Sequence, residues 1–257
     1  MNKISSLLLG AIFMLVFSQS ILAQKQNYNF KEGTVTYQIN IKEKTAGAAS
    51  GLDMLNGSTL TWSLQDKNQR ADFVLAGMAQ LALMNNSQAD LSVFLLDVPL
   101  LLDPTAVKID SWQEITNLLD ENTDSALNEA PSETTDVKIN YDKKKKKKIA
   151  KYKCKKASVQ IGEMTDVMTV YVTDNLRSEA LQGFQENFGN MEGFPLSFEL
   201  DLDDITIEIV AKEVKKTKLD KSLFEISDKY TTKSVKEFEE DMKTEFGEES
   251  EEGTFGL

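Results

Sequence analysis

Carboxylates are the side chains of this sequence with the most capacity for chemistry, because the chain contains no histidine and a single cysteine. The absence of histidine excludes Ser-His-Asp and Cys-His catalysis and removes the commonest transition-metal ligand. Paired carboxylates could still act as acid and base, but Asp203 and Asp204, like Glu239 and Glu240, are adjacent in sequence. Neighbours in a strand point to opposite faces, so these pairs make a poor dyad. The Asp-x-Asp-x-Asp-Gly spacing of a calcium loop is also missing, and we expect a protein that is not an enzyme and has no cofactor or metal.

Lysines form the second feature with chemical potential, in the stretch "DKKKKKKIAKYKCKKASV" at residues 142–159. Ten lysines and no acid lie between Lys143 and Lys156, in a chain whose net charge is -12. One interpretation is a solvated strand face, since the later lysines alternate with apolar residues, and such lysines discourage edge-to-edge aggregation. The other interpretation is contact with an anionic ligand or surface. The residues for that contact would be Lys144, Lys145, Lys146 and Lys147.

Cys154 lies within this lysine-rich stretch. As the only cysteine it cannot form an intramolecular disulfide. It alternates with lysines, which predicts a small buried apolar residue. If it were exposed instead, the surrounding lysines could lower the pKa of its thiol and make it reactive.

The N-terminus has the pattern of a secretory signal peptide. Lys3 is the only charge before an apolar run at residues 7–17, and Ile21 and Ala23 precede a cleavage site at Gln24. The run is shorter than the roughly 20 residues that span a bilayer, and no cysteine lies near the junction for lipoprotein acylation. We expect cleavage between Ala23 and Gln24, no transmembrane segment afterwards, and a periplasmic or extracellular protein that is not a lipoprotein. Export and the acidic net charge also argue against nucleic acid as a partner.

Most of the remaining chain predicts short antiparallel strands. Apolar and polar residues alternate in "GTVTYQINIKEK" from Gly33 and again around Ile207. "TLTWSLQDKNQRADFVLA" predicts two strands joined by a turn at residues 66–69. "DVKINYD" and "IAKYKCKKASVQIG" predict two more, which places a hairpin turn at residues 142–148.

The segments "MAQLALMNN" and "ADLSVFLLDVPL" predict two more strands. The Ala, Leu and Met content of residues 70–84 would also suit a helix. Strands are favoured there because apolar side chains fill both alternating faces, as expected where a sheet is covered on each side. The cover could be a helix, a loop or an acyl chain. We therefore expect these strands to contribute either to plain core packing or to the wall of a hydrophobic cavity, with Ala79 and Ala82 as small wall residues. The candidate cavity residues are Phe73, Leu75, Met78, Leu81, Leu83, Phe94 and Leu96.

Two segments predict short helices, so the expected fold class is α+β. They are "DSWQEITNLLDEN", with Asp110 or Ser111 as its cap and Glu114 positioned for a capping box, and "LRSEALQGFQENFGN". The expected organisation is a signal peptide at residues 1–23, a single domain at residues 24–235 with an acidic loop near residues 120–137, and a disordered acidic tail at residues 236–257.

The motifs "STLTWSLQDKNQRADF", "IAKYKCKKASV", "VYVTDN", "GFPLSFEL" and "AKEVKKTKLDKSLFEISDKY" occur in an order that resembles a family of exported bacterial domains. That family is of unknown function, is common in the Bacteroidota and is similar to the LolA lipoprotein carriers. The resemblance covers roughly residues 33–232. This chain departs from it at Lys151, where such domains usually have glycine, and in its acidic insertion near residues 120–137.

The resemblance implies a curved antiparallel sheet that forms an incomplete barrel, with two or so covering helices and a concavity that holds acyl chains in LolA-like proteins. Two functional hypotheses follow. The first is a non-catalytic cell-envelope protein that binds or carries a lipid-like ligand. The second is a structural or protein-interaction module of the envelope, with an envelope protein as its partner, a filled core and no small ligand.

Overall fold

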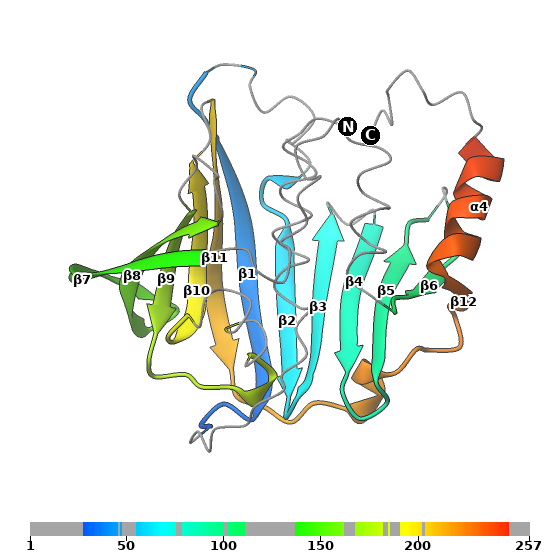
Figure 1. Ribbon diagram of the computed structural model, residues 1–257, viewed down its shortest axis with the longest axis horizontal. Coiled ribbons are helices and arrows are strands. Elements are labelled where there is room, and N and C mark those ends of the chain that lie inside the picture. Colours follow the sequence, from blue (N-terminus) through cyan, green and yellow to red (C-terminus); the bar gives the residue numbers. More distant parts are fainter. Residues whose placement is uncertain are drawn as a thin grey trace.

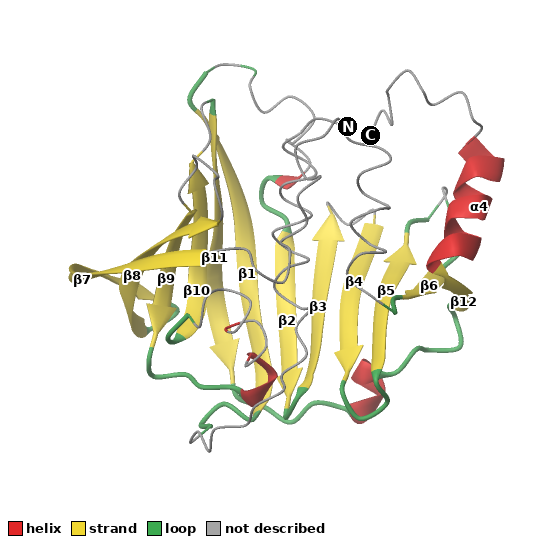
Figure 2. Cartoon of the chain, viewed as in Figure 1, coloured by secondary structure: helices red, strands yellow, loops and turns green. Residues whose placement is uncertain are grey.

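The computed structural model describes residues 28–45, 47, 55–75, 79–99, 102–110, 137–161, 168–181, 185, 191–201 and 204–246. Within these ranges, twelve strands form one sheet in the order β12-β6-β5-β4-β3-β2-β1-β11-β10-β9-β8-β7. Neighbouring strands are antiparallel except β12, which runs parallel to β6. Figures 1 and 2 show an open, twisted sheet, with β7 and β8 at one end and β6 and β12 at the other.

The strands of the sheet, in chain order, are β1 (Glu32–Glu43), β2 (Thr59–Gln65), β3 (Asn68–Leu75), β4 (Ala79–Asn86), β5 (Leu91–Asp97), β6 (Thr105–Lys108), β7 (Val137–Ile149), β8 (Tyr152–Ile161), β9 (Met168–Thr173), β10 (Phe194–Asp201), β11 (Ile205–Lys215) and β12 (Thr231–Ser234). The short 3-10 turns η2 (Glu179–Leu181) and η3 (Lys221–Phe224) and the helix α4 (Val235–Phe246) complete the described elements.

One face of the sheet, which we call the core face, carries the main hydrophobic core. In β1 every second residue from Val35 to Ile41 is buried, which confirms the alternation expected from the sequence. The register places Tyr37 opposite Leu60 of β2 and Ala211 of β11, so the apolar stripe continues across neighbouring strands. A large part of the core lies under the strands from β1 to β4 and from β8 to β11.

Aromatic rings fill the middle of this core. Phe194 of β10 lies edge-on to Phe30, with ring centroids 5.9 Å apart. The ring centroid of Trp62 of β2 lies 6.2 Å from that of Phe194. The hydroxyl of Tyr37 donates a hydrogen bond of 2.8 Å to the carbonyl of Pro195, which satisfies its polar end inside the core. These contacts tie the N-terminal strands to the C-terminal half of the sheet.

The expected fold class needs a correction, because the described chain is mainly β and contains one α-helix, α4, instead of two or so covering helices. Of the expected helix that begins at Asp110, all residues after Asp110 lie outside the described part of the chain. In the second expected helix, the described part contains the 3-10 turn η2, whose Leu181 is buried in the core, and the helical residue Gln185. Figure 1 shows α4 at the end of the sheet beside β6 and β12.

The tail also differs from expectation, because α4 makes residues 235–246 helical. Ser234 and Glu237 form a capping box at the start of α4. The Ser234 amide donates a hydrogen bond of 2.7 Å to the Glu237 carboxylate, and the Glu237 amide donates one of 3.3 Å to the Ser234 hydroxyl. The hydrogen bonds from Ser234 hold the pKa of Glu237 below its ordinary value. A local cap thus starts a helix in a segment whose acidic composition predicted disorder.

Candidate functional site

The strands β4, β5 and β6 are apolar on a second face, and that face is covered by the protein's own C-terminal segment. Of these three strands, the sequence predicted two apolar faces only for β4. We call residues 219–230 the strap and the face that they cover the strap face. Phe224 of the strap is 1% exposed and forms a second buried cluster with side chains of β4, β5 and β6. The other buried members of this cluster are Ala82, Met84, Val93, Leu95 and Ala106. The second apolar face therefore has a polypeptide cover, which is the loop alternative among the three considered.

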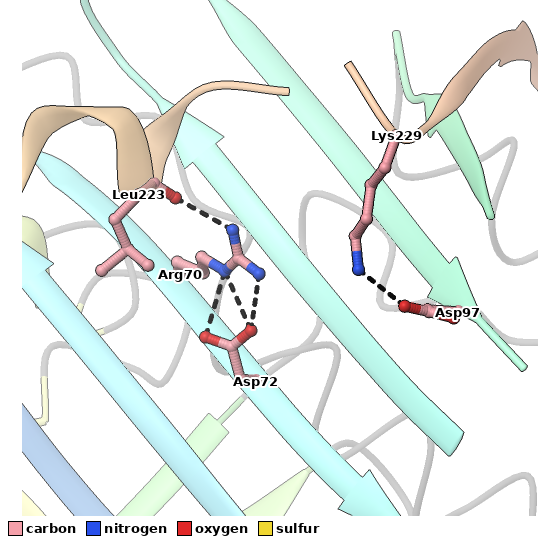
Figure 3. Close-up of polar contacts among 5 residues, drawn as sticks. All are labelled: Arg70, Asp72, Asp97, Leu223 and Lys229. Carbon is pink, nitrogen blue, oxygen red and sulfur yellow. Dashed lines mark hydrogen bonds and ion pairs between the residues drawn. The ribbon is translucent and has the colours of Figure 1, made fainter. Parts of the chain in front are cut away.

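Polar anchors fix the strap to the edges of this apolar cluster (Figure 3). Arg70 of β3 donates a hydrogen bond of 3.0 Å to the Leu223 carbonyl. Its other guanidinium nitrogens donate hydrogen bonds of 2.8–3.0 Å to the Asp72 carboxylate. Because Asp72 accepts hydrogen bonds from two of the guanidinium nitrogens, it orients the group so that the third nitrogen is aimed at the strap backbone. The Asn86 side chain holds the next carbonyl, that of Phe224, at 3.0 Å.

The two ends of the strap are held by charged groups. Glu32 of β1 accepts a hydrogen bond of 2.6 Å from the Leu219 amide and one of 2.7 Å from Gln65, and these bonds hold the pKa of Glu32 below its ordinary value. At the other end Lys229 lies 2.6 Å from Asp97 of β5, and that hydrogen bond raises the pKa of Lys229 (Figure 3). The strap is therefore anchored on both sides of Phe224.

On the core face of the same strands, the expected cavity residues form a contiguous patch. The register pairs Phe73 with Leu81 and Leu81 with Leu96, and the next pair along β4 and β5 is Leu83 with Phe94. Phe73 and Leu83 are buried, 5% and 3% exposed. Four other large apolar side chains of the patch are only half-buried, namely Leu75, Leu81, Phe94 and Leu96. Met78 lies outside the described residues.

The strap changes the assignment of one small wall residue. Ala79 pairs with Leu75, so it shares the core face with the apolar patch. Ala82 has the opposite parity and is 4% exposed within the strap-face cluster. Ala82 is therefore not part of a cavity wall on the core face, because it packs beneath the strap.

The lysine run lies in strand β7 and not in a turn, which corrects the expected position of the hairpin. The turn is formed by Ala150 and Lys151, whose φ angles are 44° and 75°. The side chain of Asp142 accepts hydrogen bonds of 2.9 and 3.2 Å from the amides of Lys144 and Lys145, at an irregularity in the pairing with β8. These bonds hold the pKa of Asp142 below its ordinary value.

Beyond this irregularity, the register places lysines directly opposite one another. Lys146 pairs with Lys155 and Lys148 pairs with Lys153. The intervening pairs, which point to the other side of the hairpin, contain the buried Ile149 and Cys154. The expected alternation of lysines and apolar residues is thus present, and one side of the hairpin end carries a group of lysines.

Within the described part of the chain, some of these lysines have counter-ions and others do not. Lys147 lies 3.2 Å from Glu208 of β11, and Lys155 lies 3.1 Å from Asp174 and 3.3 Å from Glu192. Partial burial acts to lower the pKa of Lys155, but the two carboxylates raise it overall. Among the described residues no ion pair is formed by Lys146, Lys148, Lys151 or Lys153, all of which are exposed.

Cys154 is buried, as expected from its alternation with lysines, and burial raises the pKa of its thiol to about 11. Within the described ranges no group of three or more Cys, Asp or Glu side chains is placed to hold a metal ion. Among the helices that the structure describes, none combines the length and the apolarity needed to cross a bilayer.

Sequence reasoning missed the strap, although the motif "SLFEI" was noticed. Its signal was Phe224 together with Leu219, Leu223 and Ile226, a set of apolar residues in a short segment without strand alternation. A segment of that kind must cover an apolar surface elsewhere, and β4 and β5 offered one. The capping box of Ser234 and Glu237 was likewise present as a sequence signal for α4.

Comparison with known proteins does not assign this chain to a family. No protein-family model matches the sequence, and no curated protein matches it. Among solved structures, MucB in complex with MucA(peri) is similar with 10% identity and a TM-score of 0.30, over 77% of this chain and 55% of that chain. A LolA superfamily protein from Nitrosomonas europaea, NE2245, is similar with 9% identity and a TM-score of 0.33, over 78% of this chain and 92% of that chain.

This chain therefore spans about half the length of the MucB chain. Likeness at this level assigns neither a ligand nor a partner to the chain. The structure itself shows one part of the expected LolA-like architecture, namely the open, mostly antiparallel sheet.

Proposed function

We propose that this chain is an exported, non-catalytic protein of the cell envelope that holds the apolar part of an amphiphile against the core face of β3, β4 and β5. The carrying observation is the half-buried patch around Leu81, in which cross-strand neighbours leave large apolar side chains partly open to solvent. Apolar surface of this kind is typical of ligand and partner sites. On the opposite face of β4 and β5, the strap covers the apolar side chains that the structure describes.

The proposal is tested by titrating the protein with a fluorescent fatty-acid analogue and displacing it with an unlabelled fatty acid. We expect saturable, stoichiometric binding with a negative heat-capacity change, since apolar surface is buried. Ala79→Trp should fill the space beside Leu75 and weaken binding by at least about tenfold, without lowering the melting temperature. Gln80→Trp is the matched control: Gln80 is exposed and has the opposite parity, so this variant should bind as the wild type does.

Ala82→Trp separates a binding effect from a folding effect. A tryptophan at Ala82 would have to displace the strap, so this variant should lose stability. If neither the protein purified from its host nor delipidated protein binds any amphiphile, the carrier proposal fails. The interaction module with a filled core is then the better account.

A further inference from the structure

We propose that the end of the β7–β8 hairpin is a docking surface for anionic lipid bilayers. The surface consists of Lys146, Lys148, Lys151 and Lys153, which we call the lysine face. All four side chains are exposed and form no ion pair with a described residue. The inference does not depend on the proposed amphiphile site, which lies on β3–β5.

The first argument is that this arrangement works against the stability of the hairpin. Lys148 stands directly opposite Lys153, and Lys146 stands directly opposite Lys155. Like charges in cross-strand pairs repel at the short separation of such neighbours. Lys155 is compensated by Asp174 and Glu192, whereas Lys148 and Lys153 have no counter-ion among the described residues. An external anion would relieve the repulsion that the described residues leave uncompensated.

The second argument comes from the turn. Ala150 and Lys151 both have positive φ angles, a conformation that favours asparagine and glycine in two-residue hairpin turns. A lysine at this position therefore costs backbone energy and adds one more exposed charge to the lysine face. The local sequence thus favours positive charge over turn stability.

The type of cation favours a bilayer over an acidic protein segment. The only arginines of the chain are Arg70 and Arg177, so the hairpin has none. Arginine supplies the bidentate geometry used to recognise individual carboxylates or phosphates, whereas lysine acts as a point charge. Point charges on one face suit the diffuse field of many lipid headgroups, to which each lysine contributes separately.

The distribution of charge over the molecule would orient the docked protein. The helix α4, with acids such as Glu237, Glu240 and Asp241, lies at the far end of the sheet from the lysine hairpin (Figure 1). A chain with a net charge of -12 is repelled by an anionic surface unless it presents a local basic region. Docking should therefore occur through the hairpin end, with α4 directed away from the lipid.

The test is sedimentation of the protein with vesicles of phosphatidylcholine alone or with about 30 mol% phosphatidylglycerol, which gives an anionic surface potential. The wild type should bind the anionic vesicles only, and about 1 M salt should abolish binding because the screening length falls to about 3 Å. The variant in which glutamine replaces Lys146, Lys148, Lys151 and Lys153 should bind the anionic vesicles at least about tenfold more weakly than the wild type. Its melting temperature should not fall, because repulsive pairs are removed.

Two control variants make the outcome specific. In the first control, glutamine replaces four exposed lysines outside the lysine face, namely Lys108, Lys212, Lys218 and Lys221. This variant has the same net charge as the lysine-face variant, and it should bind the vesicles as the wild type does. Replacement of the lysine face by arginine keeps its charge and should also preserve binding.

Several results would overturn the inference. The wild type could bind both vesicle compositions equally well, or it could fail to bind the anionic vesicles. The control with Lys108, Lys212, Lys218 and Lys221 replaced could also lose as much binding as the lysine-face variant. Ala79→Trp, which tests the amphiphile site, should dock as the wild type does, so the two proposals can fail separately.

Discussion

At the scale of single residues, Lys151 carries the clearest sign of a conflict between local structure and charge. Its φ of 75° lies in the left-handed region, where a side chain is disfavoured and glycine is not. We predict that Lys151→Gly raises the stability by about 1 kcal/mol, because the strain of the turn is relieved. Thermal or urea unfolding measures the change.

The matched control for that substitution is Lys148→Gly. Lys148 lies in β7 and has no positive φ, so glycine there should destabilise the protein by up to about 1 kcal/mol through added backbone freedom. If both variants change stability in the same direction, the turn is not strained at Lys151.

At the scale of elements, the strap explains why β4 and β5 are apolar on two faces. Phe224 is 1% exposed and fills the centre of the strap-face cluster. We predict that Phe224→Ala lowers the free energy of unfolding by about 3–5 kcal/mol, since a large side chain is removed from a buried site. Phe224→Leu keeps most of the volume and should cost less than about 1.5 kcal/mol. Both losses are measured by chemical denaturation, and a loss below about 1 kcal/mol for Phe224→Ala would show that the strap does not seal this face.

At the scale of the whole molecule, the central prediction is export with removal of residues 1–23. The mature protein should begin at Gln24, either free or cyclised, because Ala23 offers the small residue that the cleavage site needs. The intact mass of protein from the periplasmic fraction measures this. Ala23→Lys should block processing and leave the precursor in the membrane fraction. Recovery of intact Met1 in washed membranes of the wild type would contradict the prediction.

Much of the fold could be predicted from the sequence, because strand alternation is a local property. The alternation of β1 and β11 and the two-faced apolar pattern of β4 were visible in the order of residues, and the structure places all three in the sheet. The burial of Cys154 followed from the same rule. Each depends only on neighbours two positions away, whose side chains must share a face.

The tertiary structure decided what covers each face and where the lysine hairpin turns. The cover of β4 and β5 comes from the strap, more than a hundred residues later in the chain, and local periodicity contains no information about such a partner. Within the lysine run successive residues are identical, so their order cannot distinguish one register from the next. The register is set instead by the burial of Ile149 and Cys154 and by the hydrogen bonds of Asp142, which place the turn at Ala150 and Lys151.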